Sequence, residues 1–252
     1  MNNFNGKIKA IIFDLGETLL TFGKVNERKV FARSAHLTYK YLKSLGQPVG
    51  SYRWYCWKNM FSIRVRYMIS NILKKDFNAL ELLKKVNRSL KLDNLQWEEL
   101  FWRWYEPLSI LGKIEDDLIA TLSKFKAAGL KLGILSNTFI HSSSVERHLR
   151  RLEIFDFFSV RLYSYQFGFR KPDMRIFRTV AEKIGESPEN ILFVGDRIKK
   201  DIEPALKAGM RTALKSAYTN EGQVVPDGVW KISRISELPE LIDDVNSSSP
   251  AV

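Results

Sequence analysis

A short apolar run near the start of the chain places the strongest constraint on its fold. Residues 8–13, IKAIIF, are nearly all apolar and together have the length of one strand. Such a run is typical of a strand that is buried on both faces of a parallel sheet. The run ends at Asp14, and Gly16 then allows the chain to turn. Open α/β sheets bind ligands outside the carboxyl ends of their strands, so Asp14 is either a turn residue or part of a site.

Length and composition limit the class of protein. The chain has 252 residues, of which 45% are apolar and 27% charged, which suits one large soluble domain or a core with a smaller insert. Its apolar runs are too short to span a membrane, and MNNFNGKIKA has no apolar signal core, so we expect a cytoplasmic protein without a membrane partner. The single Cys56 excludes an internal disulfide and a cysteine-based zinc site, and its aromatic neighbours predict that it is buried.

Residues 21–110 differ in kind from the segments that flank them. They carry most of the net charge of +12 and five of the six tryptophans. Their apolar residues recur at helical spacing, which predicts four helices with no strand between them. We expect these helices at residues 25–45, 52–73, 79–90 and 97–105, the last one stopped by Pro107. The pattern indicates an all-helical domain inserted after the first strand.

The basic, tryptophan-rich character of this insert has three interpretations. It is a lid that selects an anionic substrate, a surface for nucleic acid, or a helical bundle with solvated basic faces and an aromatic core. We favour the helical bundle, because positive charge alone shows affinity for anions and the sequence contains no nucleic-acid motif. If the insert contacts a substrate, the best candidates are Arg53, Lys58, Arg64 and Arg66.

Strands and helices alternate from residue 115 onward. Apolar runs predict strands at residues 130–135, 160–163, 191–194, 210–214 and 229–232. Helical patterns alternate with them, at residues 116–128, 144–152, 173–184, 198–208 and 237–245. This order predicts an α/β protein with a Rossmann-like, doubly wound parallel sheet as its core. We expect the core to comprise residues 1–20 and 111–246, the helical insert residues 21–110, and a flexible tail residues 247–252.

Three of the apolar strands end in polar residues, namely Asp14, Ser136 and Asp196, and Lys171 lies in a loop between the last two. The topology places all four at one edge of the sheet. Asp14 and Asp196, with Asp201 behind them, offer the oxygen ligands that Mg²⁺ prefers. Ser136 and the amides of the following helix can bind a phosphate, whose charge Lys171 can stabilise. Asp14 is then a candidate nucleophile.

Four segments resemble, in order, the four motifs of the haloacid dehalogenase-like (HAD) superfamily: FDLGETL, LGILSNT, GFRKPDMRIF and VGDRIKKDIEPALKAGM. The resemblance covers residues 7–20 and 112–245. It implies that the helical insert is a cap of the family's type 1. It also implies that Asp14 and Lys171 are catalytic, with an aspartyl-phosphate intermediate on Asp14. Ser136, Asn137 and Lys171 correspond to the phosphate-binding residues.

The resemblance also implies a Mg²⁺ site. The ligands from the protein are the carboxylates of Asp14 and Asp196 and the backbone carbonyl of Gly16, a contact that any side chain permits. Asp201 corresponds to the second acid of the fourth motif, which supports either the metal ligands or the lysine. Thr18 lies in the first motif as a further supporting residue.

One position departs from the family pattern. Most phosphatases of the family carry a second Asp two residues after the nucleophile, which acts as general acid and then as general base. Here that residue is Gly16, and loss of such a group typically lowers the rate by about 10²–10⁴. Glu17 is the adjacent candidate for a substitute acid, although its side chain is expected to point elsewhere. A residue of the cap or a water bound to the substrate is another candidate.

We therefore expect a Mg²⁺-dependent phosphatase that acts on a small, anionic phosphomonoester and turns over slowly if nothing replaces the acid. The alternatives are a catalytically impaired relative that binds a phosphorylated ligand or a protein partner, and a phosphotransferase. Dehalogenation is disfavoured, because dehalogenases of the superfamily lack the metal-binding acid that Asp196 provides. We also expect Arg170 to be a solvated surface residue, and the serines at residues 142–144 to cap a helix.

Overall fold

The computed structural model describes residues 7–248 of the chain, and its core is a six-stranded parallel sheet. The strands lie in the order β3-β2-β1-β4-β5-β6, and every neighbouring pair is parallel. Their bounds are Ala10–Phe13 for β1, Lys131–Ser136 for β2, Val160–Tyr163 for β3, Ile191–Gly195 for β4, Arg211–Lys215 for β5 and Trp230–Ile232 for β6. The predicted α/β, doubly wound sheet is confirmed.

The central strand β1 is buried on both of its faces. Ile11 and Phe13 belong to one apolar cluster, in which the ring of Phe13 lies 6.5 Å from that of Phe125. Ala10 and Ile12 point the other way and belong to a second cluster. Because successive side chains of a strand alternate between faces, both faces of a run without polar residues need a covering layer.

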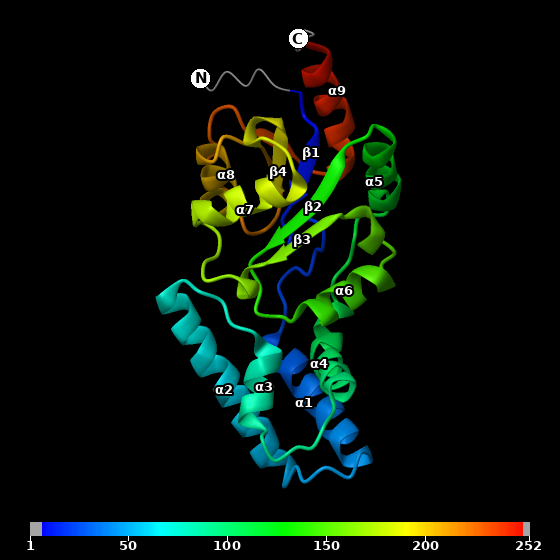
Figure 1. The fold of residues 1–252 in the computed structure, drawn as a ribbon, viewed down its shortest axis with the longest axis vertical. Coiled ribbons are helices and arrows are strands. Elements are labelled where there is room, and N and C mark those ends of the chain that lie inside the picture. Colours follow the sequence, from blue (N-terminus) through cyan, green and yellow to red (C-terminus); the bar gives the residue numbers. More distant parts are fainter. Residues whose placement is uncertain (1–6, 249–252) are drawn as a thin grey trace.

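Helices supply those two layers. Three of them cover the face of Phe13: α5 (Leu118–Ala127), α6 (Ser142–Arg151) and α9 (Leu238–Ser248). Two others cover the opposite face: α7 (Met174–Ile184) and α8 (Glu203–Lys207). Figure 1 shows the two groups on either side of the sheet. The strand order reverses at β1, between β2 and β4, so a ligand site is expected where these strands end.

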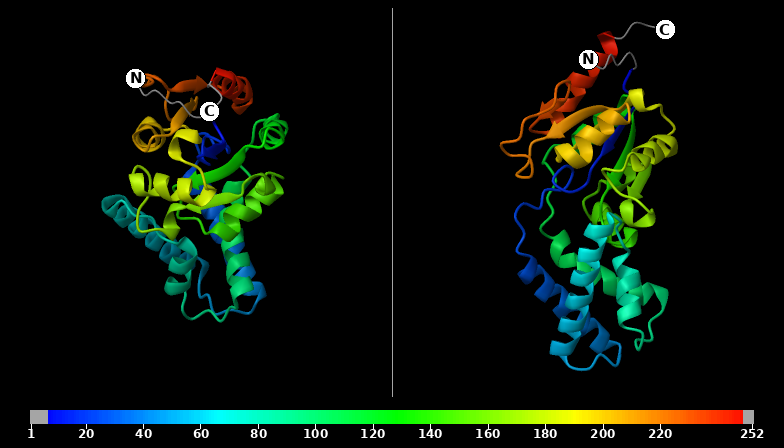
Figure 2. Two further views of the ribbon diagram at one scale, coloured as in Figure 1. Left: turned by 45° about the horizontal axis from the view of Figure 1, so that its top comes forward. Right: turned by 90° about the vertical axis from the view of Figure 1, so that its left-hand side faces the viewer.

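The insert between β1 and β2 consists of four helices, α1 (Glu27–Ser44), α2 (Tyr52–Leu73), α3 (Ala79–Val86) and α4 (Asn94–Ser109). They form a separate group on one side of the sheet, at the opposite end of the molecule from α9 (Figure 2). The two segments that connect the insert to the core pair with each other, since Thr21 and Lys113 exchange backbone hydrogen bonds of 2.8 and 3.0 Å. The expected domain limits and the type of cap stay predictions.

Several expected element ends differ from the observed ones. Pro107 does not stop α4, because helical hydrogen bonding resumes after it, where the Ile110 amide donates to the Glu106 carbonyl at 3.1 Å. The serines at residues 142–144 lie inside α6, and His141 is the cap residue, whose side chain accepts a bond from the Ser143 amide. The predicted helix 198–208 is a π-helical turn, Ile198–Ile202, followed by α8.

The flexible tail expected at residues 247–252 stays a prediction. Helix α9 continues to Ser248, and residues 249–252 lie outside the described part of the chain. None of the helices in the described part is long and apolar enough to cross a membrane. The cytoplasmic location stays a prediction.

The expected aromatic core of the insert is only partly correct. Trp97 and Trp102 are buried, but Trp54 and Trp57 are 55% and 50% exposed and stack on each other at 5.1 Å. Helix α2 turns these two rings outward, and Cys56, between them, is half-buried rather than buried.

His148 of α6 packs against both connections between the core and the insert. Its ring lies 6.5 Å from that of Phe22, and a Cβ at Gly112 would lie 2.9 Å from its Cε1 atom. Its Nδ1 atom hydrogen-bonds to the Tyr105 hydroxyl of α4 at 3.1 Å. Burial, and secondarily the charge of Arg151, lowers the pKa of His148 to about 4. The folded protein therefore holds this imidazole in its neutral form at neutral pH.

We predict that His148 makes the protein sensitive to acid. The unfolded chain takes up a proton near pH 6.5, but the folded chain does so only near pH 4, so stability falls as the pH drops through this window. The expected loss between pH 7 and pH 5 is roughly 2 kcal/mol, measured by urea unfolding at both pH values. His148→Gln retains a polar side chain but does not titrate, so its loss should be smaller by that amount. An equal loss in both proteins would contradict the prediction.

Candidate active site

Asp14 lies directly after β1, at the point where the strand order reverses. Its backbone amide donates to the Val194 carbonyl at 2.8 Å, which continues the pairing of β1 with β4 by one residue. The carboxylate is buried, and its Oδ1 atom accepts a hydrogen bond from the Lys171 ammonium at 2.7 Å. The sheet therefore delivers Asp14 to a fixed position beside a buried cation.

Lys171 joins two carboxylates. Its Nζ atom lies 2.7 Å from Asp14 and 2.6 Å from Asp201, and its side chain is only 2% exposed. Burial lowers the pKa of Lys171, but the charges of Asp14 and Asp201 outweigh that effect, so its pKa is raised overall. The lysine is therefore held in its charged form.

The side chain of Asn137 fixes the main chain of Lys171. Its Nδ2 group donates to the Lys171 carbonyl at 2.8 Å, and its Oδ1 atom accepts from the Lys171 amide at 2.9 Å. Asn137 follows β2 directly, so these bonds attach the loop before α7 to the end of a central strand. This positioning contact was not predicted. Phosphate binding by Asn137 stays a prediction and would fall to its main-chain N–H group.

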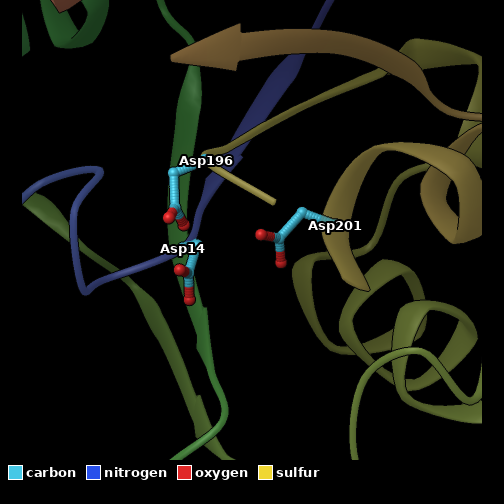
Figure 3. A group of neighbouring side chains, drawn as sticks. All are labelled: Asp14, Asp196 and Asp201. Carbon is cyan, nitrogen blue, oxygen red and sulfur yellow. The ribbon is translucent and has the colours of Figure 1, made fainter. Parts of the chain in front are cut away.

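Asp196 and Asp201 complete a cluster of carboxylates with Asp14, and Figure 3 shows the three side chains converging. One ligand atom from each lies within 4.8 Å of the others. Asp201 reaches the cluster because Gly195 has no side chain, since a Cβ there would lie 2.5 Å from the Cβ of Asp201. The Arg197 amide donates to Asp201 at 3.0 Å and holds its carboxylate in place.

The carboxylate of Asp196 has one engaged and one unengaged oxygen. Oδ2 accepts a hydrogen bond from the Thr219 hydroxyl, and the backbone carbonyl of Asp196 accepts one from Asn220 at 2.7 Å. Oδ1 is buried and has no hydrogen-bond partner among residues 7–248. Sequence reasoning missed Thr219 and Asn220, whose only signal is that two polar residues follow β5 at the same sheet edge.

A divalent cation fits this donor set. A buried carboxylate oxygen without a partner is costly, and a bound cation removes that cost. Burial raises the pKa of Asp14, Asp196 and Asp201, because it disfavours their charged forms. Lys171 is paired with the Oδ1 atoms of Asp14 and Asp201. The Oδ1 atom of Asp196 is therefore the carboxylate oxygen best placed to bind a cation. Oxygen donors of this kind suit a hard ion such as Mg²⁺.

Backbone amides further along the same loop hold the side chain of Glu17, the acidic residue that follows Gly16. The Oε1 atom of Glu17 accepts hydrogen bonds from the amides of Phe22 and Gly23, at 3.0 and 3.1 Å. Thr18 is buried, and its hydroxyl has no hydrogen-bond partner within the described chain. A Cβ built on Gly16 meets no atom within 4 Å, and the backbone there is not left-handed. The loop therefore has room for a side chain at residue 16.

A cavity of about 650 Å³ brings most of these groups together. The predicted site residues that line it are Asp14, Gly16, Glu17, Ser136, Asn137, Lys171 and Asp201. Asp196 and Thr18 are not among its lining residues. The opposite wall comes from the insert, including Tyr67, Asp76 and Tyr105, so the cavity lies between the core and the helices.

Arg170 is not the solvated residue that we expected. Its guanidinium pairs with Asp76 at 2.5 Å and donates to Asn71 at 3.1 Å. Asp76 is buried and also accepts hydrogen bonds from Ser70 of α2 and from the hydroxyl of Ser164 in the core. Asp76 therefore fastens the insert to the loop that carries Lys171. No motif in the sequence singled it out.

A family model described as haloacid dehalogenase-like hydrolase matches residues 8–209. With the parallel sheet and the acidic cluster at its carboxyl edge, this match shows that the chain belongs to the haloacid dehalogenase-like hydrolases. The resemblance of the four motifs is confirmed.

Similar proteins include named phosphatases. The chain is 35% identical over 131 residues to glyceraldehyde 3-phosphate phosphatase of Methanocaldococcus jannaschii, over 51% of this chain but only 55% of that protein. It is 31% identical over 151 residues to phosphoglycolate phosphatase of Aquifex aeolicus, over 59% of this chain and 68% of that one. A HAD phosphatase from Thermococcus onnurineus has a similar structure, with a TM-score of 0.60, 22% identity and coverage of 93% and 98%. At that identity the structure supports the fold alone.

Proposed function

We propose that this protein is a Mg²⁺-dependent phosphatase that hydrolyses a phosphomonoester through an aspartyl-phosphate on Asp14. The observation that carries the proposal is the buried Asp14 carboxylate, 2.7 Å from the Lys171 ammonium, beside an Asp196 oxygen without a hydrogen-bond partner. The named phosphatase relatives support the reaction class. The buried acid at residue 196 supports phosphate chemistry over dehalogenation.

Groups of the chain account for both displacements at phosphorus, although not for the proton that the departing alcohol takes up. An oxygen of Asp14 attacks the phosphorus, and the bond from phosphorus to the alcohol oxygen breaks as the new bond forms. Lys171 opposes the effect of burial on the pKa of Asp14 and stabilises the charge on the phosphoryl oxygens, while Ser136 donates a hydrogen bond to one of them. Water then attacks the phosphorus, releases phosphate and restores Asp14.

Mg²⁺ would be held by Asp14, Asp196 and the Gly16 carbonyl. When bound, it would neutralise charge between the nucleophile and the phosphate. In this arrangement Asp201 acts through Lys171, because its 2.6 Å ion pair fixes the ammonium opposite Asp14. Asn137 positions the same lysine through its main chain.

The proton for the departing alcohol has no evident donor on the nucleophile loop. Gly16 has no side chain, and the Oε1 atom of Glu17 is occupied as the acceptor of hydrogen bonds from the amides of Phe22 and Gly23. Glu17 is therefore a poor substitute acid. Slow turnover is expected unless the leaving alcohol is itself acidic or a bound water supplies the proton. The lack of a general acid and base also favours a phosphotransferase as the second candidate. Attack of water on the aspartyl-phosphate would be slow, so transfer to a more nucleophilic acceptor could compete with hydrolysis.

The nucleophile is tested with Asp14→Asn, in a screen of phosphate esters with Mg²⁺ and with EDTA. We expect metal-dependent release of phosphate by the wild type and a loss of at least about 10³-fold in the variant. Urea unfolding of both proteins checks that the variant is folded. Equal turnover by the two proteins would refute the proposal. Phosphate transfer to added alcohols in excess of release to water would favour the phosphotransferase.

The general acid is tested by restoring it, with Gly16→Asp. The loop has space for the side chain, so we expect a gain of about 10²–10⁴ in kcat for esters with a poorly acidic alcohol. Esters with an acidic alcohol, such as 4-nitrophenyl phosphate, should gain much less, since they need no proton. Gly16→Asn is the matched control and should gain nothing. No gain with either class of ester would mean that another group already supplies the proton.

A further inference from the structure

The helical insert contains a second cavity that the proposed chemistry does not use. Its volume is about 800 Å³, and it lies between α1, α2 and α4. The side chains around it are largely apolar and aromatic, among them Val30, Phe31, Ala35, Met60, Ile63 and Trp104. A cavity of this size and lining is typical of a site for an organic ligand.

This cap cavity adjoins the candidate active site. Six residues line both cavities, namely Val25, Glu27, Tyr67, Tyr105, Leu108 and Phe139. One end of the combined space holds Asp14 and Lys171, and the other end is apolar. A ligand that fills it has an anionic head group and an apolar body.

Within the cap cavity, the charged side chains are exposed to solvent, whereas some of the apolar ones are buried. Its charged lining residues, Glu27, Arg28 and Arg64, are exposed, whereas Ala35 and Ile63 are 4% and 8% exposed. Small polar esters would leave this apolar wall in contact with water, which is unfavourable. The wall gains free energy only from a ligand with apolar surface to bury.

We propose that the cap cavity binds the alcohol part of the substrate, and that the protein acts on phosphomonoesters of large apolar alcohols, alkyl or aryl. This inference rests on the proposed function and specifies its substrate class. It assigns Ala35 on α1 and Cys56 on α2 to two walls of a specificity pocket. The cavity, rather than any charged residue of the insert, then sets the choice of substrate.

The test is a series of phosphate esters of equal charge, assayed with the full chain and Mg²⁺. One arm uses straight-chain alkyl phosphates of two to eight carbons, and the other uses phenyl and 2-naphthyl phosphate. Glyceraldehyde 3-phosphate serves as the small polar reference. We expect kcat/KM to rise by about fourfold for each fully buried methylene, or along the aryl arm if the pocket selects rings. A flat or falling trend in both arms would overturn the inference and leave the phosphatase proposal standing.

Variants that fill the cavity give a second readout. Ala35→Leu and Cys56→Phe add volume from the two walls, and the ratio of kcat/KM for octyl over ethyl phosphate should fall at least tenfold in each. Ala127→Leu is the matched control, because it adds the same side chain as the first variant on an exposed position of α5. The control should keep the wild-type ratio. An unchanged ratio in both filling variants would contradict the assignment.

Binding separates this inference from the proposed function. Alkylphosphonates have no ester bond to hydrolyse, so calorimetric titration measures their affinity without turnover. Kd should fall with chain length in the wild type and less so in Ala35→Leu. Chain-length-dependent binding without turnover of any ester would refute the phosphatase but keep the pocket. Affinity that is independent of chain length would overturn the pocket, whatever the turnover.

Discussion

The ion pairs of Lys171 with Asp14 and Asp201 are the interaction on which the rest of the site depends. All three side chains are buried, so each pays a desolvation penalty that only close pairing offsets. Removal of one partner from such a group typically costs about 3–5 kcal/mol, because a buried charge is left uncompensated. Lys171 and Asp14 are 157 residues apart in the sequence. The parallel sheet brings them together, Asn137 holds the lysine's main chain, and Gly195 lets Asp201 approach.

The same pairing connects structure to chemistry. It keeps Lys171 charged and leaves an oxygen of Asp196 free to meet a cation, while the helical insert closes over the opposite side. Asp76, which pairs with Arg170, fastens the insert to the loop that carries Lys171. The apolar cavity lies between helices of the insert, so the Asp76–Arg170 pair also links its walls to the loop that carries Lys171.

Much of the fold could be predicted because its signals are local. The apolar run of β1 and the polar residue at its end indicated a buried strand that leads into a site, and β3 was expected at its observed residues. Contacts that depend on tertiary packing could not be predicted. The bonds from Asn137 to Lys171 and the Asp76–Arg170 pair join residues 34 and 94 positions apart, whose proximity no local pattern reveals. The outward face of Trp54 and Trp57 was missed for a related reason, since helical spacing shows that a face is apolar but not what covers it.

The central claim is that Asp14 carries the phosphoryl group. It is tested most directly by quenching the protein during turnover, reducing the acyl phosphate with borohydride, and sequencing the peptides by mass spectrometry. Reduction converts an aspartyl-phosphate to homoserine, so the account predicts homoserine at residue 14 and nowhere else, dependent on substrate and Mg²⁺. Gly16→Asp should accumulate less of it if the restored group speeds the attack of water. Substrate turnover with unmodified Asp14 under these conditions would contradict the account.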